Sequence, residues 1–323
     1  MILAGDVGGT KTHVSLFPSE GELKMLRHEK YHSKDFQSLS QIIDLFLKDY
    51  KGKIRKACVG IAGPVENGVC RATNLPWIVK SSEIAEHLKI DKVWLINDLE
   101  ANAYGIPRLQ PSELRVLNEG KRQSGNAALI SAGTGLGEAG LFWDGKRHTP
   151  FATEGGHADF APRDDLEVDL WRYLHGQFGH VSYERVISGP GIYNIYRFLI
   201  DTGLEKEDPE VRERMQKEDP PMVVTEFAVK RGCGACFRAL TWFCSMYGGA
   251  AGNLALKFLA VNGIYLGGGI VPKILEFMKE GKFVESFCAK GRFAPLLSQI
   301  PITIVLNENT ALLGAASYAR GSG

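Results

Sequence analysis

The sequence predicts an α/β protein in which mixed sheets are covered by helices. Three short strand patterns, at residues 2–6, 12–17 and 23–29, follow one another before the first helical pattern begins. Strand and helix patterns then alternate up to residue 97, and a second strand–turn–strand pattern begins near residue 127. Consecutive hairpin strands that lead into βα units are typical of a mixed sheet with helices on its faces.

The composition is that of an ordinary globular protein. The chain has 323 residues, of which 44% are hydrophobic and 23% charged, and its net charge is +1. This length allows two domains, and the near-zero charge gives no electrostatic footprint for nucleic acid or an anionic membrane. No signal-peptide pattern opens the chain and no run of 18 apolar residues occurs, so we expect a cytoplasmic protein with six reduced cysteines.

The first half reads as one α/β unit. Apolar residues recur at helical spacing over residues 36–49, a strand follows at 57–61, and Ser81 to Leu88 reads as a helix. Gly105-Ile106-Pro107 would break the next helix, which favours a hinge near Pro107. We therefore predict a small α/β domain of residues 1–107 plus about 300–323, and a larger helix-rich domain of residues 108–299.

The second half repeats a theme of the first. A strand at 127–132, a glycine turn and a returning strand at 138–142 match the arrangement between Leu3 and Phe17. We interpret this as an internal duplication, with two unrelated hairpins as the alternative. The charged, proline-rich stretch 205–221 reads as a solvated insert. The other predicted elements are a mostly helical region at 164–260 with a long helix at 235–260, strands at 263–266 and 302–306, and helices from Pro272 and at 311–319.

Two polar residues end the strand pattern that leads up to Ile96. Asn97 and Asp98 follow this buried strand directly, and Leu99 opens the next helical pattern. Open α/β sheets bind their ligands at the carboxyl ends of such strands. Asp98 also falls at the expected helix N-cap, so capping alone is the alternative interpretation.

Three glycine-rich turns each follow a predicted buried strand, at residues 5–12, 133–137 and 267–269. Such turns expose backbone N–H groups that hold anions, and phosphate can approach closely where no Cβ stands. No Gly-Lys-Ser/Thr triplet makes a Walker A loop, and the GxGxxG match at 135–140 does not open a helix. The turns together favour a cleft that grips a nucleotide from both sides.

These motifs carry a family resemblance that runs from Ile2 to about Ala316. The chain resembles the bacterial hexose kinases of the actin, Hsp70 and sugar-kinase superfamily, and most closely the ATP-dependent bacterial glucokinases. The motifs, in family order, are Gly5-Asp6-Val7-Gly8-Gly9-Thr10, Ile96-Asn97-Asp98, Gly133-Thr134-Gly135-Leu136-Gly137, Glu154-Gly155-Gly156-His157, Glu184-Arg185-Val186-Ile187-Ser188-Gly189-Pro190-Gly191 and Gly267-Gly268-Gly269-Ile270-Val271-Pro272.

The resemblance implies a two-lobed, actin-like (ribonuclease H-like) ATPase fold, each lobe a mixed sheet covered by helices, with a cleft between the lobes. It implies ATP as cofactor, with Mg²⁺ held by Asp6 through water; a turn-stabilising aspartate is the alternative for Asp6. The third glycine cluster would lie beside the adenine and ribose. The implied nucleotide-binding residues are Gly5, Asp6, Val7, Gly8, Gly9, Thr10, Gly133, Thr134, Gly135, Gly137, Gly267, Gly268 and Gly269.

The implied reaction is that of a glucokinase, which makes glucose 6-phosphate and ADP in the first step of glycolysis. Asp98 is the candidate general base for the sugar hydroxyl and also a sugar ligand. The other implied glucose ligands are Asn97, Glu154, His157 and Glu184. Without the resemblance, His157 could equally be a structural histidine, and Glu184 an ordinary surface glutamate near a helix start.

Other functions compete with this prediction. A related kinase could act on mannose, fructose or an amino sugar, and the same fold serves sugar-responsive regulators and nucleotide switches. We expect no zinc at Cys233 and Cys236, because a structural zinc takes about four ligands and no second pair accompanies them. A homodimer is usual in the family. Asn309-Thr310 departs from the family's turn near the C-terminus, which affects the predicted adenine end.

Overall fold

The computed structural model describes residues 1–72 and 75–321. The chain divides into two compact units, and each is described by itself. Unit 1 comprises Met1–Glu113, Thr149–Ala152 and Asn307–Gly323, and unit 2 comprises Leu114–His148 and Thr153–Leu306. The domain boundaries expected from the sequence, at residue 107 and near residue 300, stay a prediction.

The five-stranded sheet of unit 1 is mixed, as the sequence predicts. Its order is β3-β2-β1-β4-β8, with β1, β2 and β3 antiparallel and β1, β4 and β8 parallel. The third strand was expected at 23–29 but begins at Arg27, because Leu23 and Met25 pack beside a core cluster instead of pairing with β2. The strands are β1 (Ile2–Val7), β2 (Lys11–Phe17), β3 (Arg27–His32), β4 (Lys56–Ile61) and β8 (Lys92–Asn97).

Helices cover both faces of this sheet because its central strands are apolar on both sides. One core cluster joins Leu3 and Val59 to α1 and α2, and the other joins Ile2 and Cys58 to α3 and α12. The sequence did not predict the small antiparallel sheet β5-β6-β7, whose strands have only two or three residues. The elements are α1 (Leu39–Leu47), β5 (Val65–Glu66), β6 (Val69–Arg71), β7 (Ile78–Lys80), α2 (Ser81–Leu88), α3 (Asp98–Gly105) and α12 (Thr310–Gly321).

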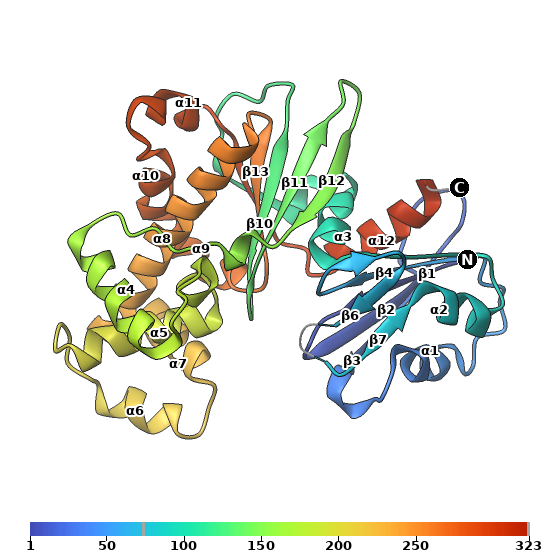
Figure 1. Cartoon of the computed structure of the whole chain (residues 1–323), viewed down its shortest axis with the longest axis horizontal. Coiled ribbons are helices and arrows are strands. Elements are labelled where there is room, and N and C mark those ends of the chain that lie inside the picture. The colour runs from blue at the N-terminus through green and yellow to red at the C-terminus, as the bar shows by residue number, and fades with distance from the viewer. Residues whose placement is uncertain (73–74, 322–323) are drawn as a thin grey trace. The chain divides into compact units, whose positions relative to one another are not determined.

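Glycines allow α3 and α12 to pack backbone to backbone, side by side in Figure 1. A Cβ on Gly314 would lie 1.7 Å from the carbonyl oxygen of Ala101, and one on Gly105 would lie 2.0 Å from that of Thr310. On the sheet side of α3, a Cβ on Gly60 would lie 2.8 Å from Cβ of Ala101. Three close approaches therefore fix the helix that begins at Asp98.

Unit 2 contains a six-stranded sheet of order β12-β11-β10-β13-β14-β9, except that residues 149–152 of its edge strand β12 are counted with unit 1. β10 pairs antiparallel with β11 and parallel with β13, just as β1 pairs with β2 and β4 in unit 1. The sequence predicted neither β9 nor β12, which are the two edge strands. The strands are β9 (Leu114–Asn118), β10 (Ala127–Ala132), β11 (Leu136–Trp143), β12 (His148–Thr153), β13 (Gly263–Gly267) and β14 (Ile302–Val305).

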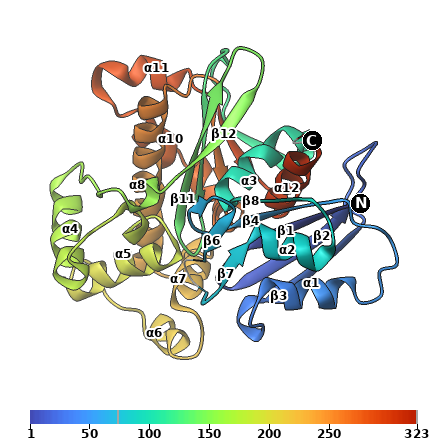
Figure 2. The same ribbon diagram turned by 45° about the vertical axis from the view of Figure 1, so that its right-hand side comes forward.

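The helices of unit 2 share one large apolar core with this sheet. The long helix predicted at 235–260 is α8, which lies beside α10 in Figures 1 and 2. The charged stretch forms α6, in which only Val211 is buried. The helices are α4 (Asp165–Phe178), α5 (Gly189–Asp201), α6 (Pro209–Met215), α7 (Pro220–Val229), α8 (Gly234–Phe258), α9 (Leu275–Lys279), α10 (Lys282–Cys288) and α11 (Ala294–Ser298). None of the described helices combines the length and apolarity that a membrane span requires.

The close approach of α12 to α3 gives a first prediction. Gly314→Ala places a methyl group 1.7 Å from a backbone oxygen that cannot move away cheaply, so we expect a loss of more than about 3 kcal/mol or failure to fold. Urea unfolding measures the difference. Gly176→Ala in α4 is the matched control, since nothing lies within 4 Å of its added Cβ and alanine favours a helix by up to about 1 kcal/mol. Equal stability of the Gly314 variant and the wild type would contradict the packing.

Candidate active site

Asn97 joins the last strand of the unit 1 sheet to α3. Its Oδ1 accepts hydrogen bonds from the backbone N–H of Leu99 at 2.9 Å and of Glu100 at 3.4 Å. Its Nδ2 donates to the carbonyl oxygen of Gly63 at 3.4 Å, and the side chain is buried. The N-cap is therefore Asn97, and the interpretation of Asp98 as the cap residue is wrong. Asp98 is instead the first residue of the helix.

Asp98 lies close enough to Asp6 to affect its ionisation. The strands β1, β4 and β8 are parallel, and Val7, Ile61 and Asn97 pair in one row at their carboxyl ends. Burial, and then the charge of Asp98, raise the pKa of Asp6 to about 7. The structure thus brings two predicted site carboxylates together at one edge of the sheet, where the charge of Asp98 makes Asp6 harder to ionise.

The first glycine turn is braced from one side. The N–H of Gly8 donates to the carbonyl oxygen of Lys11 at 3.0 Å. The hydroxyl of Ser33 donates to the carbonyl oxygen of Gly8 at 2.8 Å. Thr10 is exposed at the tip and Gly9 is partly exposed, whereas Gly5 and Val7 are buried within β1. The turn proper is therefore shorter than the predicted motif, and Gly5 and Val7 have only their backbones to offer a ligand.

In unit 2, Glu184 lies against the second glycine turn. Its Oε2 accepts a hydrogen bond from the backbone N–H of Leu136 at 2.9 Å, and a Cβ on Gly135 would lie 2.5 Å from the same oxygen. The turn is closed by a bond from the N–H of Gly133 to the oxygen of Gly135, 2.9 Å long. Thr134 is exposed at the tip, and Gly137 lies in β11. Glu184 and this turn therefore form one structural feature.

The turn that carries Glu154 and His157 lies beside the turn that carries Glu184. These short 3₁₀ helices are η4 (Gly155–His157) and η5 (Tyr183–Arg185), and the N–H of Tyr183 donates to the oxygen of Ala158 at 3.0 Å. Nε2 of His157 is 4.0 Å from Oε2 of Glu154, and both side chains are more than half exposed. The structure thus brings the three predicted sugar ligands of this unit together.

The third glycine cluster meets the end of β10. Gly268 has φ +88°, and a Cβ there would lie 2.1 Å from the carbonyl oxygen of Ala132. A Cβ on Gly267 would lie 3.2 Å from the hydroxyl of Ser131, while nothing would lie within 4 Å of a Cβ on Gly269. Because β10 and β13 are parallel neighbours, the second and third glycine clusters follow the same edge of the sheet.

Comparisons with known proteins identify the family. A model of the glucokinase family matches residues 3–322. A glucokinase of Nostoc sp. is 42% identical over 99% of this chain and 98% of its own length, and one of Shigella sonnei is 36% identical over 98% and 96%. The chain belongs to the glucokinase family.

Solved glucokinases have the same fold. The crystal structure of a glucokinase from an Antarctic psychrotroph is 31% identical and covers 99% of this chain and 98% of that one, with a TM-score of 0.85. A glucokinase from Streptomyces griseus, solved with glucose and AMPPNP, is 18% identical over 99% of both chains, with a TM-score of 0.68 that speaks for the fold alone. The predicted fold class is confirmed.

Sequence reasoning missed one acidic residue beside the predicted sugar ligands. Glu138 is buried in β11, and a Cβ on Gly155 would lie 2.0 Å from its Oε2. Burial raises the pKa of Glu138 to about 6, and Lys257 opposes the shift. The sequence signal was a single acidic residue, Glu138, among the apolar and glycine residues of a predicted strand. Only the neighbouring glycines were predicted as site residues. The carboxylate of Glu138 therefore lies against Gly155, in the turn that carries Glu154 and His157.

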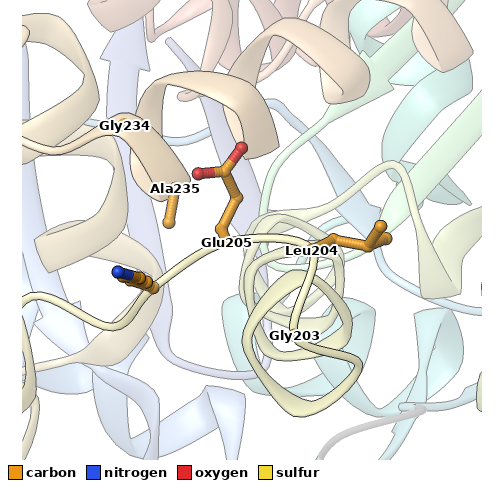
Figure 3. A pocket seen from close by; sticks show the side chains of 6 residues that line it. Gly203, Leu204, Glu205, Gly234 and Ala235 are labelled. Carbon is orange, nitrogen blue, oxygen red and sulfur yellow. The ribbon is translucent and has the colours of Figure 1, made fainter.

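The cysteine pair lies at the start of α8. Cys233 caps α8, its sulfur accepting a hydrogen bond from the N–H of Cys236 at 3.3 Å, and both thiols are buried. Within residues 1–72 and 75–321, no three His, Cys, Asp or Glu side chains are grouped to hold a metal ion. An open hollow of about 500 Å³ lies nearby, lined by residues 203–206, Gly234 and Ala235 (Figure 3). None of the predicted site residues lines it.

The buried carboxyl of Glu138 gives a pH-dependent prediction. Its folded pKa of about 6 exceeds its ordinary value of 4.5, so between these values the folded state keeps a proton that the unfolded state loses. Its contribution to stability therefore falls as pH rises through this window, by up to about 2 kcal/mol. We expect Glu138→Gln to gain stability over the wild type between pH 4.5 and 6, measured by urea unfolding. The exposed Glu119→Gln is the control, and a pH-independent difference for Glu138→Gln would refute the assignment.

Proposed function

We propose that the protein is an ATP-dependent glucokinase, transferring the terminal phosphate of ATP to the 6-hydroxyl of glucose. The products are glucose 6-phosphate and ADP. Membership of the glucokinase family over residues 3–322 is the observation that carries this proposal. The paired carboxylates of unit 1 and the clustered polar residues of unit 2 support it, because phosphoryl transfer to a sugar needs both a base and many directional ligands.

Asp98 is the proposed general base. Phosphoryl transfer passes through a loose transition state, so the proton leaves the attacking hydroxyl late in the reaction. By then the hydroxyl has become acidic, and a carboxylate is a strong enough base to accept the proton. Asp98 begins α3, whose N-terminal N–H groups and dipole favour the ionised carboxylate. Asn97 provides the cap, and Oδ1 of Asp98 also accepts a hydrogen bond from the N–H of Leu99 at 3.0 Å, which holds the carboxylate at the first turn of α3.

The proposed glucose ligands are polar side chains held on short, tightly packed segments. Asn97 and Asp98 stand at a strand–helix junction, while Glu154, His157 and Glu184 stand on two adjoining 3₁₀ turns. Recognition of sugar hydroxyls depends on ligands whose positions are fixed. A sugar that lacks the matching hydroxyl leaves a polar group of the protein without a hydrogen bond, which weakens its binding. Glucose is the substrate we propose, and other hexoses are competitors whose relative rates the experiment below measures.

The glycine turns are proposed to bind ATP. The turn at Gly8–Thr10 and the turn at Gly133–Gly135 both present backbone at the end of a strand, the arrangement in which N–H groups hold phosphate oxygens. Gly267–Gly269 would lie beside the adenine and ribose, as in the family. The open backbone at Gly269 fits a close approach by a ligand.

Asp6 fits a magnesium site by its chemistry. It is an oxygen ligand whose pKa is raised by burial and by Asp98, so a nearby divalent cation would offset the repulsion between the two carboxylates. Mg²⁺ keeps most of its waters and takes few protein carboxylates when phosphates share it, which agrees with a single aspartate. Bound there with ATP, the ion would neutralise phosphate charge. We further propose a cytoplasmic homodimer, as is usual in the family.

A hexose panel tests the proposed function. We expect ADP release, followed by a coupled assay, to depend on added glucose and to be lower with mannose, fructose or glucosamine. Mass spectrometry of the product should find glucose 6-phosphate. ADP release that is equal with and without every sugar would indicate a nucleotide switch and reject the kinase.

Replacing the proposed base tests the mechanism. We expect Asp98→Asn to lower kcat at least about 100-fold while glucose still binds, because the amide keeps hydrogen bonds but cannot accept the proton. Steady-state kinetics and glucose binding by calorimetry measure the two effects separately. Asp91→Asn is the matched control, an exposed aspartate just before the same strand. Turnover of the Asp98 variant within a few-fold of the wild type would remove this residue from the proton transfer.

A further inference from the structure

A half-buried lysine crosses the long helix of unit 2. Lys290 follows α10, and its Nζ donates to the carbonyl oxygen of Gly249 at 2.8 Å and to Oδ1 of Asn253 at 2.7 Å, both on α8. The two helices lie side by side in Figure 2. A Cβ on Gly252 would lie 2.7 Å from Cε of Lys290, so the helix leaves room for the lysine at this point. Burying an ammonium group is unfavourable, and these two acceptors compensate for it.

This lysine determines the orientation of the Asn253 side chain. An ammonium group only donates, so it must face the amide oxygen and not the amide nitrogen. The Nδ2 group of Asn253 is thereby turned toward Tyr183 and donates to its Oη at 2.7 Å. Burial lowers the pKa of Lys290 to about 8, with Arg163 adding to the shift and Glu167 opposing it.

Tyr183 connects these bonds to the sugar-binding turns. Its ring is buried and packs edge to face on Phe160, with centroids 5.8 Å apart, and its N–H donates to the oxygen of Ala158 just after η4. The next residue is Glu184, whose carboxylate accepts from the N–H of Leu136. Hydrogen bonds therefore join Lys290 to Asn253 and Asn253 to Tyr183, and Tyr183 precedes Glu184, which bonds to the residue after the second glycine turn.

We propose that Lys290, Asn253 and Tyr183 are positioning residues that hold Glu184 in the orientation that binds glucose. This rests on the proposed function, because Glu184 is a glucose ligand only if the protein is a glucokinase. None of the three is placed in contact with the sugar. A purely structural role, in which Lys290 only ties α10 to α8, is the alternative, and it would affect stability without changing the affinity for one substrate.

The test compares Tyr183→Phe and Lys290→Met in the full-length enzyme. Each removes one hydrogen-bonding group and keeps most of the side-chain volume. We expect the KM for glucose to rise about 3- to 10-fold in each, the loss typical of one hydrogen bond, with kcat and the KM for ATP within about 2-fold of the wild type. Because the residues act in series, the double variant should show the rise of one single variant and not the product of the two.

Lys282→Met is the matched control, an exposed lysine of α10 that should leave all three constants unchanged. If Lys290→Met does not fold, Tyr183→Phe, which lacks only one oxygen atom, still decides the question. An unchanged KM for glucose in Tyr183→Phe, an equal rise in the KM for ATP, or multiplying effects in the double variant would overturn the proposal. Absence of glucose-dependent ADP release by the wild type would instead overturn the proposed function.

Discussion

In unit 1, two carboxylates lie at the carboxyl ends of the parallel strands β1, β4 and β8 of a mixed sheet. Asp6 and Asp98 come from the ends of strands whose last residues pair in one row, and the charge of Asp98 contributes to raising the pKa of Asp6 to about 7. Such crowding is unfavourable for folding alone and is typical of functional sites. The N-terminus of α3 stabilises the charge of Asp98, and a cation near Asp6 would stabilise the other.

Steric limits explain three glycines beside the predicted site of unit 2. Side chains at Gly155, Gly156 and Gly268 would lie 2.0, 2.0 and 2.1 Å from oxygen atoms of the neighbouring β10–β11 strands. These positions let the turns bearing Glu154 and His157, and the turn after β13, lie directly on the ends of β10 and β11. The backbone of the turns is thereby fixed close to the glycines that are proposed to bind phosphate.

The sequence predicted the features that depend on local patterns. The strand that ends at Asn97, the helix after it and the long α8 were predicted from hydrophobic spacing, and the structure has all three. It did not predict β9 or β12, because edge strands expose residues such as Val116 and Phe151 and so lack a one-sided apolar pattern. The cap was assigned one residue late, since Asn and Asp are equally good caps and only the backbone geometry distinguishes them.

The network behind Glu184 could not be predicted from the sequence for a different reason. Its hydrogen bonds join residues that lie 70 and 37 positions apart, and each residue alone has an ordinary context. Asn253 is one polar residue in a long helix, and Lys290 stands beside Gly291 and Arg292 with no local pattern that marks it as buried. Only the packing of α8 against α10 brings the lysine to the asparagine, and only the lysine decides which end of the amide faces Tyr183. Long-range orientation of this kind is a property of the folded core, and under our proposal the orientation of Glu184, which a motif predicts as a ligand, depends on residues that no motif contains.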